Sequence, residues 1–204
     1  MNLQRLKLVE KQFLQLYPGG FDNPEILNES KKHRGPQMTA MAQEMFAPEK
    51  FENSKQIALD MSKIISRSSV VSVFEKPRFR DFIESLSPDE CQTLSKALYE
   101  QLHGNEKKGF NSLIKFLQPE KLAKWTLITI IQAYYYPAKE VFIKPTTVKN
   151  IINFFDIENI TYSATPTYDF YSKYRDTINE LKTHTHKSLQ PNNLAFSGFL
   201  MLSM

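Results

Sequence analysis

The sequence predicts an all-α protein, an irregular multi-helix bundle or helical array with at most short extended segments. Apolar residues recur every three or four positions along most of the chain, as they do on one face of a helix. Proline and glycine separate these segments, and residues that favour helix N-caps stand at several of their starts. The prediction is therefore a chain of helices joined by turns.

Composition favours a globular protein. The 204 residues can bury a sizeable core, and 41% hydrophobic with 24% charged residues is typical of a folded domain. We expect one helical domain over residues 1–204, with a looser N-terminal lobe over 1–86 and a helical core over 87–204.

The sequence offers no membrane span or secretory signal. The longest apolar run, Leu127–Tyr136, is about half of the roughly 20 residues that a bilayer requires. The N-terminus has helical periodicity instead of the continuous apolar core of a signal peptide. Cys91 is the single cysteine, so no internal disulfide forms, which fits a reducing cytosol and predicts a cytoplasmic location.

Helices are predicted along the N-terminal part of the chain. The first covers residues 3–16, and a second begins at Pro24, because proline at the first helical position wastes no backbone donor, and ends near Lys32. A Met-rich segment opens at Gly35, and its flexible thioether side chains are expected to fill gaps in the core. A longer helix is predicted from Asn53 to Ser66.

The middle of the chain carries the clearest local signals. Ser87 and Glu90 form a capping box, in which each side chain bonds the backbone amide of the other residue. The helix that they start is predicted to end at Gly104. Another apolar stripe runs over residues 110–117, and a helix over 122–135 is apolar around much of its girth. We expect that last helix at the centre of the fold.

Shorter elements are predicted in the C-terminal third. Residues 141–143 and 161–163 are expected to be brief extended segments. Thr146 or Thr147 is predicted to cap a helix between them, because threonine favours the N-cap position. The final long helix is predicted over residues 168–181.

Three motifs in this region resemble part of a known family. They are Phe142–Lys149, Pro166–Tyr171 and Asn193–Met201. Residues 105–204 resemble the C-terminal part of a family of uncharacterised bacterial cytosolic proteins, some of which are loosely linked to DNA metabolism or restriction. The resemblance implies a bacterial origin and a cytosolic location, and it assigns no catalytic residue.

Basic residues near a helix start predict an anion site. Lys144 and Lys149 flank Thr146 and Thr147, where free backbone amides and the positive end of the helix dipole favour a phosphate or carboxylate. Arg175 in the following helix is predicted to complete the pocket, because a guanidinium binds phosphate through two parallel hydrogen bonds. Alternatively, a threonine only caps the helix and both lysines are solvated.

A second basic segment interleaves cations with aromatic residues. Lys76, Arg78 and Arg80 alternate with Phe79 and Phe82, a mixture that single-stranded nucleic acid binders use for stacking and phosphate contacts. The phenylalanines also lie at helical spacing and would serve equally well in a core. The net charge of +4 permits weak attraction to nucleic acid but does not indicate a dedicated electrostatic binder.

Some residues imitate the patterns of enzyme active sites, but their surroundings in the sequence do not support catalysis. Asp89 and Glu106 imitate the carboxylates of a metal-dependent nuclease, but both belong at helix ends and not on neighbouring strands. His184 and His186 have no further ligand nearby to complete a zinc site. Cys91 lies on an apolar helix face, where burial makes a thiol inert. We predict no catalytic residue, no metal site and no cofactor.

The chain ends on an apolar segment, Leu194–Leu202, which must be buried. It is expected to pack into the core of its own chain or, alternatively, to form a homodimer contact.

Three functional hypotheses follow. The first is a non-catalytic binding module that contacts nucleic acid, a DNA-associated protein or another anionic ligand through its basic residues. The second is a scaffold or homo-oligomer that docks through the apolar tail. The third is an enzyme with an unrecognised pocket beside Tyr134–Tyr136 and the helix start at Thr146.

Overall fold

The computed structural model describes residues 1–204 and confirms the predicted all-α class. It contains eleven α-helices, three short 3-10 helices and no strand. The two segments that we expected to be extended, 141–143 and 161–163, pair with no strand and serve as connections. The α-helices are α1 (Leu3–Leu16), α2 (Pro24–Lys31), α3 (Gly35–Met45), α4 (Ser54–Arg67), α5 (Glu75–Ser85), α6 (Pro88–His103), α7 (Glu106–Leu117), α8 (Trp125–Tyr135), α9 (Pro145–Phe154), α10 (Tyr168–Thr183) and α11 (Asn193–Leu202).

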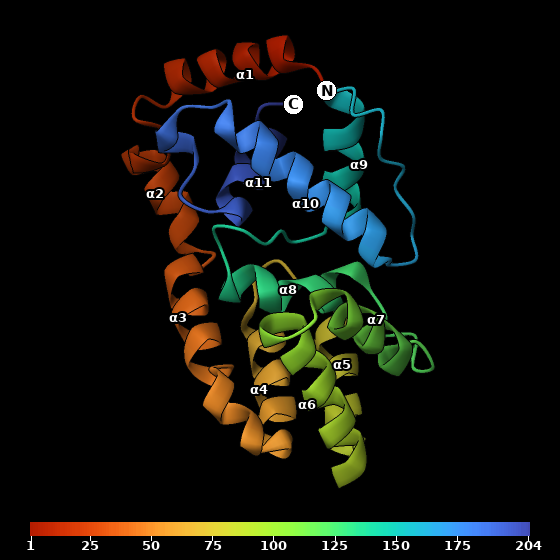
Figure 1. Cartoon of the computed structure of the whole chain (residues 1–204). Helices are drawn as coiled ribbons and strands as arrows, with labels where there is room; N and C mark the ends of the chain where they lie inside the picture. Colours follow the sequence, from red (N-terminus) through yellow and green to blue (C-terminus); the bar gives the residue numbers. More distant parts are fainter.

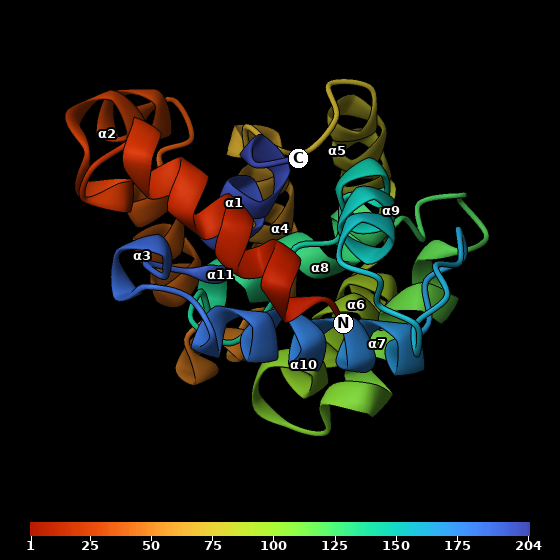
Figure 2. The same cartoon turned by 90° about the horizontal axis from the view of Figure 1, so that it is seen from above.

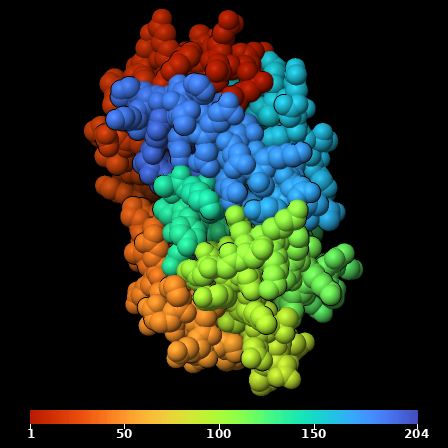
Figure 3. Space-filling view, viewed as in Figure 1, coloured from red at the N-terminus to blue at the C-terminus, as the bar shows by residue number.

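The helices are arranged in two tiers. In Figure 1, α4, α5, α6 and α7 form the lower tier, whereas α1, α9, α10 and α11 form the upper tier, and α8 lies between them. Helices α2 and α3 run down one side and join the tiers (Figure 1). Figure 2 shows α1 crossing over the upper tier above α11. Both chain ends therefore contribute to the same end of the molecule, where their surfaces adjoin (Figure 3).

Helix α8 is the central helix, as predicted. Every residue from Trp125 to Tyr134 is buried, and α8 packs against α3, α4, α6 and α7. A helix that is apolar on all sides has no face to offer to water, so other helices must surround it. Its buried Thr129 hydroxyl accepts a hydrogen bond from the Ile143 amide at 3.0 Å and thereby anchors the connection to α9.

Helices α6 and α7 approach each other unusually closely. The capping box predicted at Ser87 and Glu90 is present at the start of α6, which ends at His103 just before Gly104. At Gly109 in α7, an added Cβ would lie 2.1 Å from the Gln101 backbone nitrogen. Because only glycine permits this approach, the first turn of α7 lies beside the last turns of α6.

The apolar tail packs into its own chain as the helix α11, which the sequence did not predict. Phe196, Phe199 and Leu200 are fully buried, and the Phe199 ring meets the Phe13 ring of α1 edge-on at 5.1 Å. Leu202 at the end of the helix is 72% exposed. The tail therefore ties the C-terminus to the N-terminal helix.

No α-helix combines the length and the apolar character that crossing a bilayer requires.

The capping box predicts a pH-dependent contribution to stability. Hydrogen bonds from the Ser87 side chain and backbone lower the pKa of Glu90 below its ordinary value of 4.5. A carboxyl whose pKa falls on folding stabilises the protein above its unfolded pKa, and this contribution is lost as the pH falls through the folded value. We expect wild type to exceed Glu90→Gln in free energy of unfolding at pH 7, with the difference shrinking progressively as the pH falls below 4.5. Urea unfolding of both proteins at pH 7 and at several pH values below 4.5 measures the difference in free energy of unfolding. A difference that stays constant with pH would contradict the hydrogen bonds described at Glu90.

Burial of the tail predicts unequal costs for two truncations in α11. Phe199→Ala should lower the free energy of unfolding by about 3–5 kcal/mol, because it leaves a cavity beside Phe13. The control Leu202→Ala, at an exposed position of the same helix, should cost less than about 0.5 kcal/mol. Chemical denaturation of both variants measures how much free energy of unfolding each one loses. Equal losses would show that α11 does not pack as described.

Candidate ligand-binding sites

The predicted anion motif begins α9, but its capping residue differs from our prediction. Lys144 occupies the N-cap position and Pro145 the first helical position, and no side chain caps the helix. The prediction that Thr146 or Thr147 caps α9 is therefore wrong. Proline is favoured at the first helical position and holds the preceding residue in an extended conformation, which places the cap at Lys144. The first amides of α9 consequently have no partner within the helix.

A cavity of about 310 Å³ adjoins this helix start. We call it the Lys144 cavity. Lys144 and Thr147 line it on one side, and Gly198 of α11 lines it as well. Lys144 is the sole lysine, arginine or carboxylate residue in its wall. The apolar part of the wall includes Val70, Phe142, Leu194, Ala195 and Met201.

The Lys144 cavity also has a polar contact deep in the fold. Tyr134 of α8 lines the cavity, and its hydroxyl lies 3.0 Å from the hydroxyl of buried Ser68. Burial raises the pKa of Tyr134, and the hydrogen bond with Ser68 offsets only part of this effect. Tyr134 is therefore a neutral hydroxyl at physiological pH.

The other residues of the predicted anion motif lie outside this cavity. Thr146 is exposed, and the Lys149 ammonium lies over the Tyr162 ring, 4.9 Å from its centre. Of the motif, the structure brings only Lys144 and Thr147 to the cavity wall.

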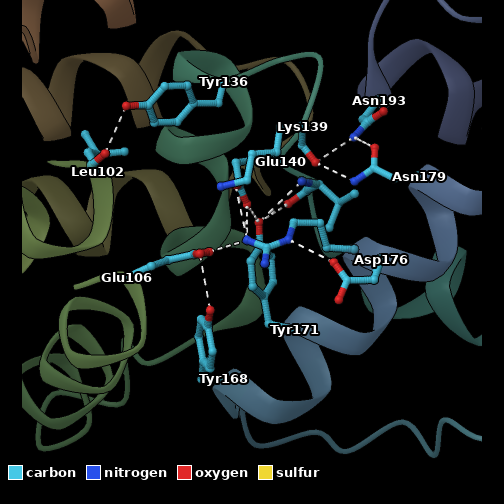
Figure 4. A network of polar contacts seen from close by, with 12 residues as sticks. Leu102, Glu106, Tyr136, Lys139, Glu140, Tyr168, Tyr171, Asp176, Asn179 and Asn193 are labelled. Carbon is cyan, nitrogen blue, oxygen red and sulfur yellow. Dashed lines mark hydrogen bonds and ion pairs between the residues drawn. The ribbon is translucent and has the colours of Figure 1, made fainter. Parts of the chain in front are cut away.

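Arg175 is buried in an ion-pair network. Its guanidinium lies 3.0 Å from the Glu140 carboxylate and also pairs with Glu106 of α7 and, at 3.6 Å, with Asp176. Figure 4 shows these carboxylates converging on one point, with Tyr171 beneath. Burial lowers the pKa of Arg175, but the nearby Glu140 and Glu106 carboxylates outweigh it, and the net pKa is raised. The predicted role of Arg175 at an anion pocket is not supported, because carboxylates already match its charge.

The network extends to neighbouring side chains. The Tyr171 hydroxyl donates to Glu140 at 2.7 Å, and the Lys139 ammonium lies 2.8 Å from the same carboxylate. The Tyr168 hydroxyl donates to Glu106 at 3.2 Å. Burial, and then the charge of Glu140, raise the pKa of Tyr171 well above its ordinary value. Tyr171 therefore acts as a hydrogen-bond donor that remains protonated.

The basic segment of α5 is divided between two faces of the helix. Phe79 is fully buried and Phe82 packs against the core, so these rings serve as core and not as a stacking platform. Arg80 pairs with Asp81 at 2.8 Å and with Glu84 at 3.9 Å. The remaining cations, Lys76 and Arg78, make no ion pair, and Arg78 donates to the Glu120 backbone carbonyl at 3.5 Å.

A second cavity, of about 350 Å³, lies beside the Arg175 network. We call it the Gln132 cavity. Gln132 of α8 and Gln101 of α6 line it and are 1% and 4% exposed. Neither polar atom of the Gln132 amide has a hydrogen-bond partner, and neither does the Gln101 Oε1. Such atoms are rare in folded proteins, because each costs about 1–3 kcal/mol when left unpaired. Glu106, Lys139 and Glu140 supply the charged part of the wall.

Neither cavity holds a metal-binding cluster. No three histidine, cysteine, aspartate or glutamate side chains are arranged to hold a metal ion. Cys91 is buried in α6 and unpaired.

No protein-family model, curated protein or solved structure matches this chain. The resemblance of residues 105–204 to a bacterial family therefore stays a prediction.

The buried network predicts a large difference between two arginine substitutions. Arg175→Met should lower the free energy of unfolding by about 3–5 kcal/mol, because it leaves the buried Glu140 carboxylate without its main partner. Arg80→Met removes an exposed ion pair and should cost much less than Arg175→Met, because water screens exposed charges. Urea unfolding at pH 7 compares the two variants. Similar costs would show that Arg175 is not buried among these carboxylates.

Proposed function

We propose that the protein is a non-catalytic binding module and that its ligand is a small organic anion with an apolar body. The ligand would occupy the Lys144 cavity, with its acidic group at the start of α9 and its apolar part against α11.

The observation that carries this proposal is the placement of Lys144 in a wall that contains no other lysine or arginine and no carboxylate. Lys144 lines the cavity beside a helix start that no side chain caps. The unpaired amides, the helix dipole and the ammonium group all favour negative charge at this place. The apolar side chains of the wall suit an apolar group, and polar residues such as Ser30, His33 and Asn192 stand beside them. Apolar surface with a limited number of polar groups is typical of small-molecule sites.

A single anion site at Lys144 replaces the broad basic surface that the sequence predicts. Nucleic acid binding depends on many cations that neutralise successive phosphates. Arg175 and Arg80 are already paired with carboxylates, so they do not add to such a surface. Nucleic acid as a partner stays a prediction, which would rest on Lys76, Arg78 and Lys149.

The Lys144 cavity also lies where the enzyme hypothesis placed a pocket, beside Tyr134 and the start of α9. Binding of an anion does not by itself distinguish a binding module from an enzyme. Release of a chemically modified ligand would favour the enzyme hypothesis.

Binding of octanoate tests the proposal. Isothermal titration calorimetry on the full chain should give saturable binding of octanoate, and weaker binding of octanol and octylamine. Lys144→Met should weaken octanoate binding roughly tenfold, because it removes a charge-assisted contact. The control Lys149→Met, in the same helix but outside the cavity wall, should leave the affinity unchanged.

A second variant blocks the cavity without disturbing the fold. A Cβ added at Gly198 meets no atom within 4 Å, and leucine is a better helix former than glycine. We expect Gly198→Leu to remain as stable as wild type and to lose octanoate binding. Equal affinity for octanoate and octanol, or binding that survives Gly198→Leu, would contradict the proposal. Salt-sensitive binding of a DNA oligonucleotide without octanoate binding would favour the nucleic acid prediction instead.

A further inference from the structure

We infer that one face of the protein docks on the surface of an anionic lipid bilayer. Two segments form this face, residues 31–34 at the turn between α2 and α3, and residues 67–76, which connect α4 to α5. We call it the docking face. Docking is an interaction distinct from the proposed function, because it does not require the Lys144 cavity to hold an anion.

The connection between α4 and α5 exposes two adjacent apolar side chains. Val73 is 70% exposed and Phe74 is 80% exposed, more than any other large hydrophobic residue of the chain. The Phe74 amide donates to the Ser72 hydroxyl at 3.2 Å, and Val71 is buried in the core. Single exposed hydrophobic residues are common, but a contiguous pair at the edge of the fold indicates a contact surface.

The two segments of the docking face adjoin each other. The His33 Nδ1 lies 2.9 Å from the Ser69 hydroxyl, and the Arg67 guanidinium donates to the Met41 sulfur of α3 at 3.5 Å. Figure 2 shows α2 and the connection from α4 to α5 along the same side of the molecule, at the upper edge of the view. The exposed apolar pair and the basic turn therefore belong to one surface.

The docking face carries an excess of positive charge. It contains five lysine or arginine residues and one carboxylate, Glu75, which accepts from the Thr126 hydroxyl at 2.7 Å. The neighbouring Glu29 pairs with Lys32 at 2.7 Å. Five positive and two negative charges leave a net charge of +3. The cations of this face that make no ion pair are Lys31, Arg34, Arg67 and Lys76.

This combination fits an anionic bilayer better than a nucleic acid. Surface-bound proteins bury apolar side chains at the boundary of headgroups and acyl chains while basic residues contact anionic headgroups. Nucleic acid binding relies on several aromatic rings that stack on bases. The docking face exposes only the ring of Phe74, because Phe79 is buried and Phe82 packs against the core. Val73 has no ring to stack, but it can enter a lipid surface.

The Lys144 cavity adjoins the docking face. His33 and Val70, one from each segment of the face, line the cavity. Docking therefore places the cavity beside a bilayer, where anions with an apolar body are concentrated. This consequence alone rests on the proposed function.

Binding of the full chain to lipid vesicles tests the inference. Flotation should recover the protein with vesicles of phosphatidylcholine that contain about one-third phosphatidylserine, and binding should weaken as salt is raised. Vesicles of phosphatidylcholine alone should bind at least roughly tenfold more weakly. Equal binding to both vesicles, no binding to either, or preferential binding of a single-stranded oligonucleotide would overturn the inference.

Two substitutions locate the docking face. Phe74→Ser should weaken binding to the anionic vesicles at least roughly tenfold, because a large apolar side chain no longer enters the lipid. The control Leu8→Ser removes a side chain that is 55% exposed on α1, which covers the top of the molecule in Figure 1, and should bind as wild type does. Both positions are exposed, so the urea midpoints should match that of wild type. Unchanged vesicle binding by Phe74→Ser would overturn the inference.

The basic turn contributes separately. Lys31→Gln should weaken vesicle binding roughly fivefold, because each basic residue beside an anionic surface contributes on this scale. The control Lys50→Gln removes an equal charge from the exposed segment 48–52, which packs against α6, and should have a smaller effect. Equal effects of the two substitutions would show that only the net charge attracts the protein.

Fluorescence reports directly whether residue 74 enters the lipid. The emission of Phe74→Trp should shift to shorter wavelength on anionic vesicles, and lipids brominated in their acyl chains should quench it, whereas Leu8→Trp should show neither change. Emission typical of water at position 74 in the vesicle-bound protein would overturn the inference. Gly198→Leu, which fills the Lys144 cavity, should bind vesicles as wild type does. Docking can thus be tested even if octanoate does not bind.

Discussion

The ion pairs of Arg175 fix the connection on which both cavities depend. Arg175 in α10 pairs with Glu140 in the segment 136–144 and with Glu106 at the start of α7. This single side chain thus joins the upper tier, the connection that follows α8, and the lower tier. Residues of the same connection line both cavities: Lys139 and Glu140 face the Gln132 cavity, and Phe142 and Lys144 face the Lys144 cavity.

Side chains of α10 and α11 hold the backbone of the same connection through hydrogen bonds. The Lys139 carbonyl accepts from Asn179 and Asn193, both at 2.9 Å, and the Val141 amide donates to the Tyr171 hydroxyl at 3.3 Å. A buried ion pair recovers little more than the cost of removing its charges from water, so its main effect is to specify one arrangement of the chain. We infer that Arg175 specifies the path of this segment more than it adds to stability.

Periodicity and capping signals predicted most of the fold, because they depend on residues close in sequence. The boundaries of α1, the capping box at Ser87 and the central position of α8 were all predicted. The helix α11 was missed, because its apolar residues cover all sides and give no clear stripe. The cap of α9 was misassigned, because the preference of threonine for N-caps was weighed above the geometry that Pro145 imposes.

The sites were harder to predict, because they depend on contacts between distant residues. Arg175 is separated from its partners by 35 and 69 positions, so the sequence could not show that carboxylates surround it. Gln132 gave one usable signal, a polar side chain in a helix that is otherwise buried on all sides.

Amide hydrogen exchange of Val141 and Ile143 tests the fixed path of this connection most directly. We predict that both amides exchange as slowly as the amides of α8, because both are buried and hydrogen-bonded to side chains. Exchange at the rate of an exposed loop would show that the connection is not held, and neither cavity would then have the wall described.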